Sequence, residues 1–485
     1  MGLCGAYHLL DLYRGRIYLN RMMITNMTHV HLIGIGGSGL SAIARLLKES
    51  GYTVTGSDRA LTAFAADLQT AGVTIYIGHH PRNIQGADWV VRSSAIPDDN
   101  VEVIAAQRAN IPVYKRADFL GKLMADKTGI AIAGTHGKTT TTAMVAFLLS
   151  ELGRDPSFIV GGVLSNYQVN ARAGKGNPFV IEADEYDRMF LGLKPRIEVV
   201  TNLEHDHPDC YPTYEDMVSA FESFVALLPV DGILIGCVED KGAAALLNKA
   251  RREGRNVIAY NVQADLTLNT SHWMQARSLQ PNEQGGFEFE ATTNINESET
   301  AHVALQVPGV HNVRNALAAL AVMTALGLPL KEAAAKLSFF KGTGRRFEVK
   351  GEKRGITVID DYAHHPTEIK ATLAAARARY SQQRIWAVWQ PHTYSRTQAL
   401  FYEFTLAFKD ADEVIVLEIY PSREPKQDFS SAEVVSAMAH PSVRFIASLK
   451  DATEYLLKHL RHKDVLLVLS AGDADQISSN VLAGL

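Results

Sequence analysis

Short apolar runs alternate with longer helix-like stretches along most of the chain, which is the pattern of parallel β-strands joined by helices. The first group of runs begins at residue 29 and continues at residues 52–56, 73–77, 89–93 and 111–114. A second group starts at residue 128 and continues at residues 158–160, 179–183, 197–202, 233–236 and 257–260. A third occupies residues 356–360, 385–389, 414–417, 444–446 and 465–469. The pattern predicts an α/β fold.

Further strands and helices are predicted between and after these runs. Residues 266–307 are polar and alternating, which predicts antiparallel strands. Helices are expected at residues 140–152, 329–337 and 367–380, and an alanine-rich helix ends at residue 325.

The three groups of strands predict three domains, in keeping with a length of 485 residues. We expect a Rossmann-like domain at residues 29–126, a central P-loop ATPase-like α/β domain at 127–344 and a C-terminal Rossmann-like α/β domain at 345–485. The glycine-rich, basic run 341–346 is a candidate hinge or a simple linker. Residues 1–28, with methionines at 22, 23 and 27, are expected to be a dispensable extension.

Composition narrows the class of protein. The chain has 48 basic and 52 acidic residues, so no polybasic surface for nucleic acid stands out. No apolar run is long enough for stable membrane insertion or for a signal core. The three cysteines are far apart and form no framework, which suits a reducing compartment. We therefore expect a cytoplasmic enzyme, and the sequence leaves its oligomeric state open.

The strongest chemical signal follows the apolar run that starts at residue 128. That run ends in Gly134-Thr-His-Gly-Lys-Thr139, after which a helix opens. Glycines there let backbone N–H groups close on phosphate oxygens, while Lys138 can reach the outer phosphates and Thr139 can offer a hydroxyl to Mg²⁺. The loop is shorter than the usual pattern, because Ile132 stands where the first glycine is expected. It predicts a nucleoside triphosphate site, with ATP as the preferred ligand.

A second glycine-rich turn lies near residue 29. The strand there leads into Gly34-x-Gly36-x-x-Gly39 and a helix, and Asp58 follows about twenty residues later, as in dinucleotide-binding domains. On these residues alone, a nicotinamide-dependent oxidoreductase stays a competing hypothesis. It would leave the Lys138 loop without a role.

Carboxylates and histidines follow two of the apolar runs in the central part. One run ends in Glu182-Ala-Asp-Glu185 and the other in Glu204-His-Asp-His207. Because parallel strands present their carboxyl ends at one edge, these groups are expected to lie near the phosphate loop. Hard oxygen ligands suit Mg²⁺. Solvated acidic loops or helix caps are the plainer interpretation of each segment alone.

Taken in order, the motifs of this chain resemble those of the Mur ligases, the ATP-dependent amino-acid ligases of peptidoglycan precursor synthesis. The matching pieces are Gly34-Ile-Gly-Gly-Ser-Gly39, Gly56-Ser-Asp58, Ser93-Ser-Ala-Ile96, Gly134-Thr-His-Gly-Lys-Thr-Thr140, Glu182-Ala-Asp-Glu185, Thr201-Asn-Leu-Glu-His-Asp-His207, Pro308-Gly-Val-His-Asn-Val-Arg-Asn315, Gly342-Thr-Gly-Arg-Arg-Phe347, Asp360-Asp-Tyr-Ala-His-His-Pro-Thr-Glu368 and Gln390-Pro-His-Thr-Tyr-Ser-Arg396. Within the family, they are most similar to the branch that joins L-alanine to UDP-N-acetylmuramate.

The resemblance implies a role for each domain. The first would bind a UDP-sugar and no nicotinamide, through Gly34, Gly36, Gly37, Ser38, Gly39, Ser57, Asp58, Ser93 and Ser94. ATP would be bound by Gly134, Thr135, His136, Gly137, Lys138, Thr139, Thr140, His311, Asn315, Asp361 and either Arg345 or Arg346. Mg²⁺ would be held by Thr139, Glu182 and His207. The incoming amino acid would meet Tyr362, His364 and Arg396.

The implied reaction joins L-alanine to the lactyl carboxylate of UDP-N-acetylmuramate through an acyl phosphate, for cell-wall biogenesis, cell shape and division. Its expected catalytic residues are Lys138, His207, His364 and Arg396. His364 would orient or deprotonate the amine, with a structural role as the alternative. Closure of the domains on one another would exclude water from the acyl phosphate.

Two features of the sequence bear on which branch of the Mur ligases it resembles. Some relatives have an arginine where this chain has Thr393, which leaves Arg396 as the evident partner for the alanine carboxylate. No lysine occurs between Lys194 and Lys241, where ligases that add later residues carry a carbamylated lysine, and this favours the alanine-adding branch. The competing hypotheses are a recycling ligase that attaches a preformed tripeptide and a non-enzymatic nucleotide-binding regulator.

Overall fold

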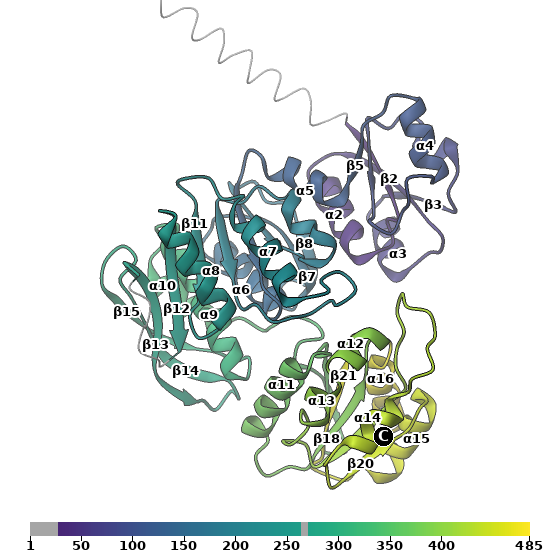
Figure 1. The fold of residues 1–485 in the computed structure, drawn as a ribbon, viewed down its shortest axis with the longest axis vertical. Helices are drawn as coiled ribbons and strands as arrows, with labels where there is room; N and C mark the ends of the chain where they lie inside the picture. The colour runs from purple at the N-terminus through teal and green to yellow at the C-terminus, as the bar shows by residue number, and fades with distance from the viewer. Residues whose placement is uncertain (1–27, 263–269) are drawn as a thin grey trace, which may run out of the picture.

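The computed structural model describes residues 28–262 and 270–485, and the predicted extension lies almost entirely outside them. Figure 1 shows three α/β bodies that follow one another along the chain. Each is built on its own sheet, so the predicted three-domain α/β fold is confirmed. No helix within the described parts of the chain is long and apolar enough to span a membrane.

The N-terminal sheet is parallel throughout, with the order β3-β2-β1-β4-β5 of a Rossmann-like fold. Its strands are β1 (His29–Ile33), β2 (Thr53–Asp58), β3 (Thr74–Ile77), β4 (Trp89–Arg92) and β5 (Val113–Lys115). The connecting elements are α2 (Ser38–Glu49), α3 (Ala63–Thr70), the 3₁₀ turn η1 (Pro81–Ile84), α4 (Val101–Arg108) and α5 (Arg116–Met124). The glycine turn therefore lies between the central strand β1 and α2, at the carboxyl edge of the sheet.

The central sheet has ten strands in the order β15-β14-β13-β12-β11-β10-β6-β9-β7-β8. They are β6 (Thr128–Ala133), β7 (Ser157–Leu164), β8 (Val169–Arg172), β9 (Pro178–Glu182), β10 (Ile197–Val200), β11 (Ile233–Cys237), β12 (Asn256–Val262), β13 (His272–Pro281), β14 (Phe287–Thr293) and β15 (Glu299–Ala304). The antiparallel pairing of β13, β14 and β15 confirms the prediction for the later part of residues 266–307; residues 266–269 lie outside the described ranges. Strand β8 was not expected, and its four residues are mostly half-buried.

Helices cover both faces of this sheet: α6 (Lys138–Glu151), η2 (Tyr186–Gly192), α7 (Tyr214–Val225), α8 (Lys241–Arg252), α9 (Val310–Ala325) and α10 (Leu330–Leu337). Helix α6 is buried on all sides from Thr139 to Leu149, because it packs against α9 and against strands of the sheet. This burial explains why residues 143–149 of the helix are apolar without interruption rather than amphipathic. The start of α6 is thereby fixed at the end of β6, in the middle of the domain.

The C-terminal sheet has the order β16-β17-β21-β18-β19-β20, and only its edge strand β16 is antiparallel. Its strands are β16 (Glu348–Lys353), β17 (Ile356–Asp361), β18 (Ile385–Gln390), β19 (Glu413–Val416), β20 (Val443–Phe445) and β21 (Val465–Ser470). Its helices are α11 (Pro366–Arg379), α12 (Tyr394–Ala399), α13 (Phe401–Thr405), α14 (Ser431–Ala437), α15 (Leu449–His459) and α16 (Asp475–Gly484). The sequence analysis missed β16, which is largely exposed and carries no apolar run.

Candidate active site

The turn between β6 and α6 has the backbone of a phosphate-binding loop. Gly134 and Gly137 have positive φ angles of 130° and 82°, and a Cβ at Gly134 would lie 2.1 Å from the Thr201 hydroxyl oxygen. No side chain caps the N-terminus of α6, so its first N–H groups and the positive end of its dipole are left for an anion. The local structure therefore fits the predicted triphosphate site.

Lys138 opens this helix and forms an ion pair with a buried carboxylate. Its Nζ lies 2.8 Å from Glu185 Oε1 and also donates to the Gly134 carbonyl at 2.6 Å. Burial opposes the charge of Lys138, but Glu185, Glu182 and Asp184 outweigh it and raise the lysine pKa. Burial raises the pKa of Glu185 to about 7 against the opposing effect of Lys138, and its Oε2 has no hydrogen-bond partner. An unpartnered carboxylate oxygen is thus buried beside the loop.

The predicted Mg²⁺ ligands are only partly brought together. Thr139 Oγ1 donates to Glu182 Oε1 at 3.0 Å, and Glu182 Oε2 accepts the Gly161 N–H. His207 lies instead beside Glu185, with Nε2 3.7 Å from Oε1. Hydroxyl and carboxylate oxygens are the donors that Mg²⁺ prefers, so Thr139, Glu182 and Glu185 fit such an ion. Glu185 was grouped with Glu182 among the carboxylates that suit Mg²⁺, but it was not named as a ligand.

A cavity of about 340 Å³ opens beside the loop, between the central and C-terminal domains. Its lining includes most of the residues expected to contact ATP: His136, Gly137, Thr139, Thr140, His311, Asn315, Arg346 and Asp361. Burial, with help from Arg314 and Arg346, lowers the pKa of His311 to about 4, so its imidazole is neutral at pH 7. The space and its lining are suited to a nucleotide.

Arg345 and Arg346, which the sequence left as alternatives, point to different places. Arg346 lines the cavity and lies 3.5 Å from Glu368. Arg345 donates to the Ser470 carbonyl at 2.7 Å, inside the C-terminal domain. Of the two, Arg346 is therefore the one that faces the nucleotide cavity.

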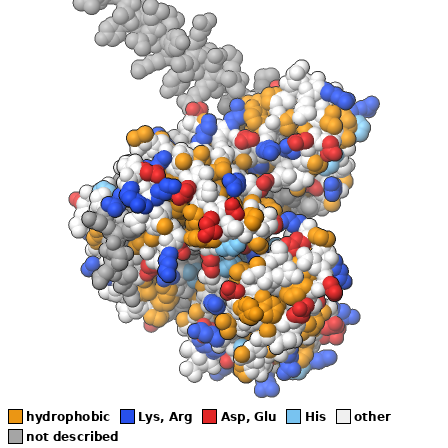
Figure 2. All heavy atoms as spheres, in the orientation of Figure 1, with side chains coloured by type: hydrophobic (Ala, Val, Ile, Leu, Met, Phe, Trp, Pro, Cys, Tyr) orange, Lys and Arg blue, Asp and Glu red, His pale blue; other side chains and the backbone are white. Residues whose placement is uncertain are grey.

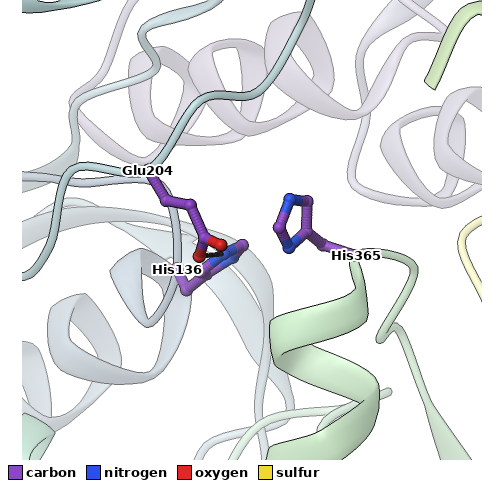
Figure 3. A group of neighbouring side chains, drawn as sticks. All are labelled: His136, Glu204 and His365. Carbon is purple, nitrogen blue, oxygen red and sulfur yellow. Dashed lines mark hydrogen bonds and ion pairs between the residues drawn. The ribbon is translucent and has the colours of Figure 1, made fainter. Parts of the chain in front are cut away.

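Histidines and carboxylates gather where the central domain meets the C-terminal domain, as Figure 2 shows. His136 Nε2 lies 3.1 Å from Glu204 Oε2 and its Nδ1 lies 3.2 Å from Glu368 Oε1, which belongs to α11. His365, just before α11, faces the His136 ring with the ring centroids 4.7 Å apart (Figure 3). Burial opposes protonation of His136, but Glu204 and Glu368 raise its pKa to about 9. His136 is a charged bridge between the two domains.

His136, Glu204 and His365 could also be considered as a metal site, since one ligand atom of each lies within 4.8 Å of the others. The hydrogen bonds argue otherwise. Both ring nitrogens of His136 face carboxylates, and His365 Nδ1 accepts the Thr367 N–H. A proton on His136 satisfies both carboxylates without a metal.

The Arg396 side chain crosses the same boundary. It is 4% exposed, and its Nε donates to Asp206 Oδ1 at 2.8 Å. Its two terminal nitrogens lie 3.2 Å from His392 Nδ1 and 3.5 Å from His207 Nδ1. Arg396 and the candidate metal ligand His207 thus share one cluster. Asp206 and His392 are members of this cluster that the sequence analysis did not assign.

His364 and Tyr362 complete the C-terminal side. The His364 and Tyr362 rings meet edge to face with centroids 5.4 Å apart, and His364 Nδ1 lies 2.9 Å from the Tyr362 carbonyl. Burial lowers the pKa of His364 to about 3, so it is neutral at pH 7 and a weak base. This favours the positioning role for His364 over proton abstraction.

Three comparisons with known proteins agree with one another. Sequence models match in the order "Mur ligase family, catalytic domain" at residues 29–128, "Mur ligase middle domain" at 132–323 and "Mur ligase, glutamate ligase domain" at 345–472. The UDP-N-acetylmuramate–L-alanine ligase of Renibacterium salmoninarum is 41% identical over 95% of this chain and 97% of its own length. The enzyme of the same name from Desulfosudis oleivorans is 43% identical over 94% and 98%.

The chain belongs to the Mur ligase family. Among solved structures, the UDP-N-acetylmuramate-alanine ligase MurC of Thermotoga maritima is 28% identical, with a TM-score of 0.76 and coverage of 94% of this chain and 98% of that one. A murein peptide ligase from Psychrobacter arcticus is 29% identical, with a TM-score of 0.67 and the same coverage. The resemblance found in the sequence is thus confirmed, and the oxidoreductase hypothesis loses its support.

The predicted N-terminal site of this Mur ligase surrounds the first glycine turn. Asp58 Oδ2 accepts the Gly36 N–H at 2.8 Å, so this carboxylate holds the turn in shape. Ser57 is buried and donates to Glu102, which is 0% exposed. Glu102 also accepts from Asn83 and the His80 N–H, and despite burial its partners lower its pKa to about 2. Gly34 packs against Ser93, which with Ser94 follows β4, so the predicted UDP-sugar residues share one edge of the sheet.

Glu102 went unnoticed in the sequence because it lies on α4, outside the recognised motifs. A single acidic residue in the first turn of a helix is normally exposed, so nothing in the sequence indicates that this one is buried. Only the fold shows that its carboxylate fixes Ser57.

Proposed function

We propose that this Mur ligase joins L-alanine to the lactyl carboxylate of UDP-N-acetylmuramate at the expense of ATP, in peptidoglycan precursor synthesis. The observation that carries ATP-dependent ligation is the uncapped phosphate loop, whose Lys138 meets buried carboxylates beside a nucleotide-sized cavity. Relatives named for the alanine reaction, similar over nearly the whole chain, support the choice of substrates.

In the proposed reaction, the lactyl carboxylate attacks the γ-phosphorus of ATP, forming an acyl phosphate and ADP. The amine of L-alanine then attacks the acyl carbon and phosphate leaves. Lys138 and the N–H groups at the start of α6 stabilise the charge on the transferred phosphoryl group. Arg346 faces the same cavity and adds positive charge there.

Mg²⁺ would be held by Thr139 and Glu182, with Glu185 or His207 beside them, and when bound it supplies charge neutralisation at the phosphates. The chain's own residues position the partners. Arg396, next to His207, would bind the alanine carboxylate, and Tyr362 and neutral His364 would border the amino acid. The UDP-sugar would be held at the glycine turn by Gly34, Gly36, Gly37, Ser38 and Gly39, with Ser57, Asp58, Ser93 and Ser94. Because ATP and nucleotide sugars are cytoplasmic metabolites, we also propose a cytoplasmic location.

The proposal is tested by phosphate release with UDP-N-acetylmuramate, ATP and Mg²⁺, scanned over single amino acids and a preformed tripeptide. We expect L-alanine to give the highest kcat/KM. Preference for the tripeptide would establish the recycling reaction in its place. Absence of ATP turnover with every acceptor would favour a non-enzymatic nucleotide-binding protein.

Lys138→Ala tests the phosphate loop itself. Ligation should fall at least about 1000-fold, because the variant loses a cation that faces the developing charge. Binding of the UDP-sugar, measured by calorimetry, should be retained, since its site is in another domain. Lys194→Ala, at an exposed lysine outside the loop, is the matched control. Near-normal turnover of Lys138→Ala would contradict the assignment.

A further inference from the structure

The backbone at Thr393 is held in an unfavourable conformation. Its φ of 68° and ψ of 145° fall in a region that is almost confined to glycine, yet Thr393 is β-branched and only 3% exposed. Such a conformation persists only where the surroundings enforce it. Thr393 lies immediately before α12, the short helix that carries Arg396.

The enforcing contacts come from the loop that follows β19. Glu424 Oε2 accepts the N–H groups of Tyr394 and Ser395, at 2.6 and 3.1 Å, and Glu424 Oε1 accepts the Ser395 hydroxyl. In the same loop, the Tyr420 carbonyl accepts the Thr393 N–H at 2.9 Å. The turn is therefore fixed on both sides of Thr393, and Glu424 supplies most of the bonds.

Glu424 has the chemistry that this place requires. Three donors converge on it, and an ionised carboxylate is the only side chain that accepts with both oxygens and donates with neither. A glutamine could keep all three bonds only if the Ser395 hydroxyl became an acceptor, and it would lose the negative charge that strengthens them. The negative charge of Glu424 also interacts favourably with the positive end of the helix dipole at the start of α12.

The braced turn sets the direction of Arg396. Thr393 Oγ1 accepts the Arg396 N–H at 3.4 Å, so Arg396 lies in the first turn of α12. From there its guanidinium reaches Asp206 and His207 of the central domain. A rotation of the Thr393 backbone toward an ordinary conformation would move the start of α12 and change the direction of this guanidinium.

We propose that Glu424 is a positioning residue for amino-acid binding: it holds the strained Thr393 turn so that Arg396 meets the carboxylate of the incoming amino acid. This inference rests on the proposed function. In this role Glu424 acts through Arg396, since its hydrogen bonds go to Tyr394 and Ser395 at the start of α12. Its loss should therefore change the KM for the amino acid and spare binding of the other two substrates.

The test combines Glu424→Gln with Thr393→Gly in a double-mutant cycle. In the otherwise unchanged enzyme, E424Q should raise the KM for L-alanine about 10- to 100-fold, because a small misplacement of a binding group is costly. KM values for ATP and the UDP-sugar should stay within about twofold, since their predicted contacts lie elsewhere. In the Thr393→Gly background, the E424Q effect should shrink to less than about threefold, because glycine adopts this φ and ψ without strain. Lys426→Ala, at an exposed residue of the same loop, should behave as wild type.

The outcomes separate the two proposals. A wild-type enzyme that shows no alanine-dependent phosphate release overturns the proposed function without reference to Glu424. An active wild type whose alanine KM is unmoved by E424Q overturns the positioning role. An E424Q effect that is equal for all three substrates, or equal with and without Thr393→Gly, also overturns it, because the residue would then be merely structural.

Discussion

The central domain meets its two neighbours through interfaces of opposite character. Toward the N-terminal domain it shares one hydrophobic core, in which Leu120 and Phe119 of α5 join Phe190 and Leu193 of the central domain. Toward the C-terminal domain the contacts are mainly polar, and that domain keeps separate cores of its own. They include the ion pairs of His136 with Glu368, Arg396 with Asp206 and Arg423 with Asp209.

The difference indicates which boundary can open. Separating a shared apolar core exposes that surface to water at a cost proportional to its area, so the first two domains should move as one body. Ion pairs regain much of their energy from water when they separate, so a polar interface opens more cheaply. The ATP cavity lies at the polar interface. Substrate entry and the closure that excludes water are therefore expected there.

The largest effect is expected from Asp206→Ala at the polar interface. It leaves Arg396 buried without its partner, which costs about 3–5 kcal/mol in a buried pair. Because this interface can open, we expect the C-terminal domain to undock and let Arg396 reach water. Small-angle scattering should show a larger radius of gyration, and turnover should fall at least about 100-fold. An unchanged radius together with full activity would mean that the pair does not hold the domains.

At the apolar interface, Leu120→Ala should destabilise the protein by about 3 kcal/mol through the cavity it leaves. Leu120 is 4% exposed and lies beside Phe190 and Leu193. The loss, measured by urea unfolding, should be the same in low and high salt, because no charge is involved. A loss that varied with salt would show that this boundary also depends on ion pairs.

Raising the pH should loosen only the polar boundary. His136 has its pKa raised to about 9 by Glu204 and Glu368, whereas free histidine titrates near 6.5. Its contribution to stability is therefore complete below about pH 6.5 and is lost as the pH rises through about 9. Hydrogen-exchange protection factors, which correct for the intrinsic rise of exchange with pH, should fall at the start of α11 across that range, while those in α5 should not.

His136→Gln is the control for this titration. The variant keeps a polar side chain that does not ionise, so the step in the protection factors between about pH 6.5 and 9 should disappear. A step that persisted in His136→Gln would assign the titration to another group at the interface.

The sequence predicted the strands, the sheets and the phosphate loop, but it did not predict the contacts between residues that are far apart in the chain. Strands, sheets and the phosphate loop follow from local patterns, because burial on both faces of a parallel strand leaves an apolar run. Lys138 was predicted to be a phosphate ligand because a strand, a glycine-rich turn and a helix coincide around it. Its partner Glu185 was not, since a pair 47 residues apart forms only through the fold.

The ionic interface was harder still to foresee. His136 and Glu368 are 232 residues apart, and no sequence pattern indicates that they form an ion pair. His136 was expected to contact ATP, and Glu368 was given no role. No local sequence pattern indicates the positive φ of Thr393, because glycine adopts this conformation readily and threonine rarely does. Departures of this kind are imposed by tertiary contacts, and they occur here where the amino acid is expected to bind.

The smallest effect is expected from Arg423→Ala, at the edge of the polar interface. Arg423 lies 2.7 Å from Asp209 and packs over the Tyr186 ring, but its side chain is 45% exposed. Solvent screens such a pair, so its loss should cost no more than about 1 kcal/mol and the cost should vanish in high salt. Comparing Arg423→Ala with Asp206→Ala over a salt series therefore distinguishes the exposed ion pair at the edge of the interface from the buried ion pair at its centre. If Arg423→Ala undocked the C-terminal domain as fully as Asp206→Ala, the interface would depend on its total charge rather than on one buried pair.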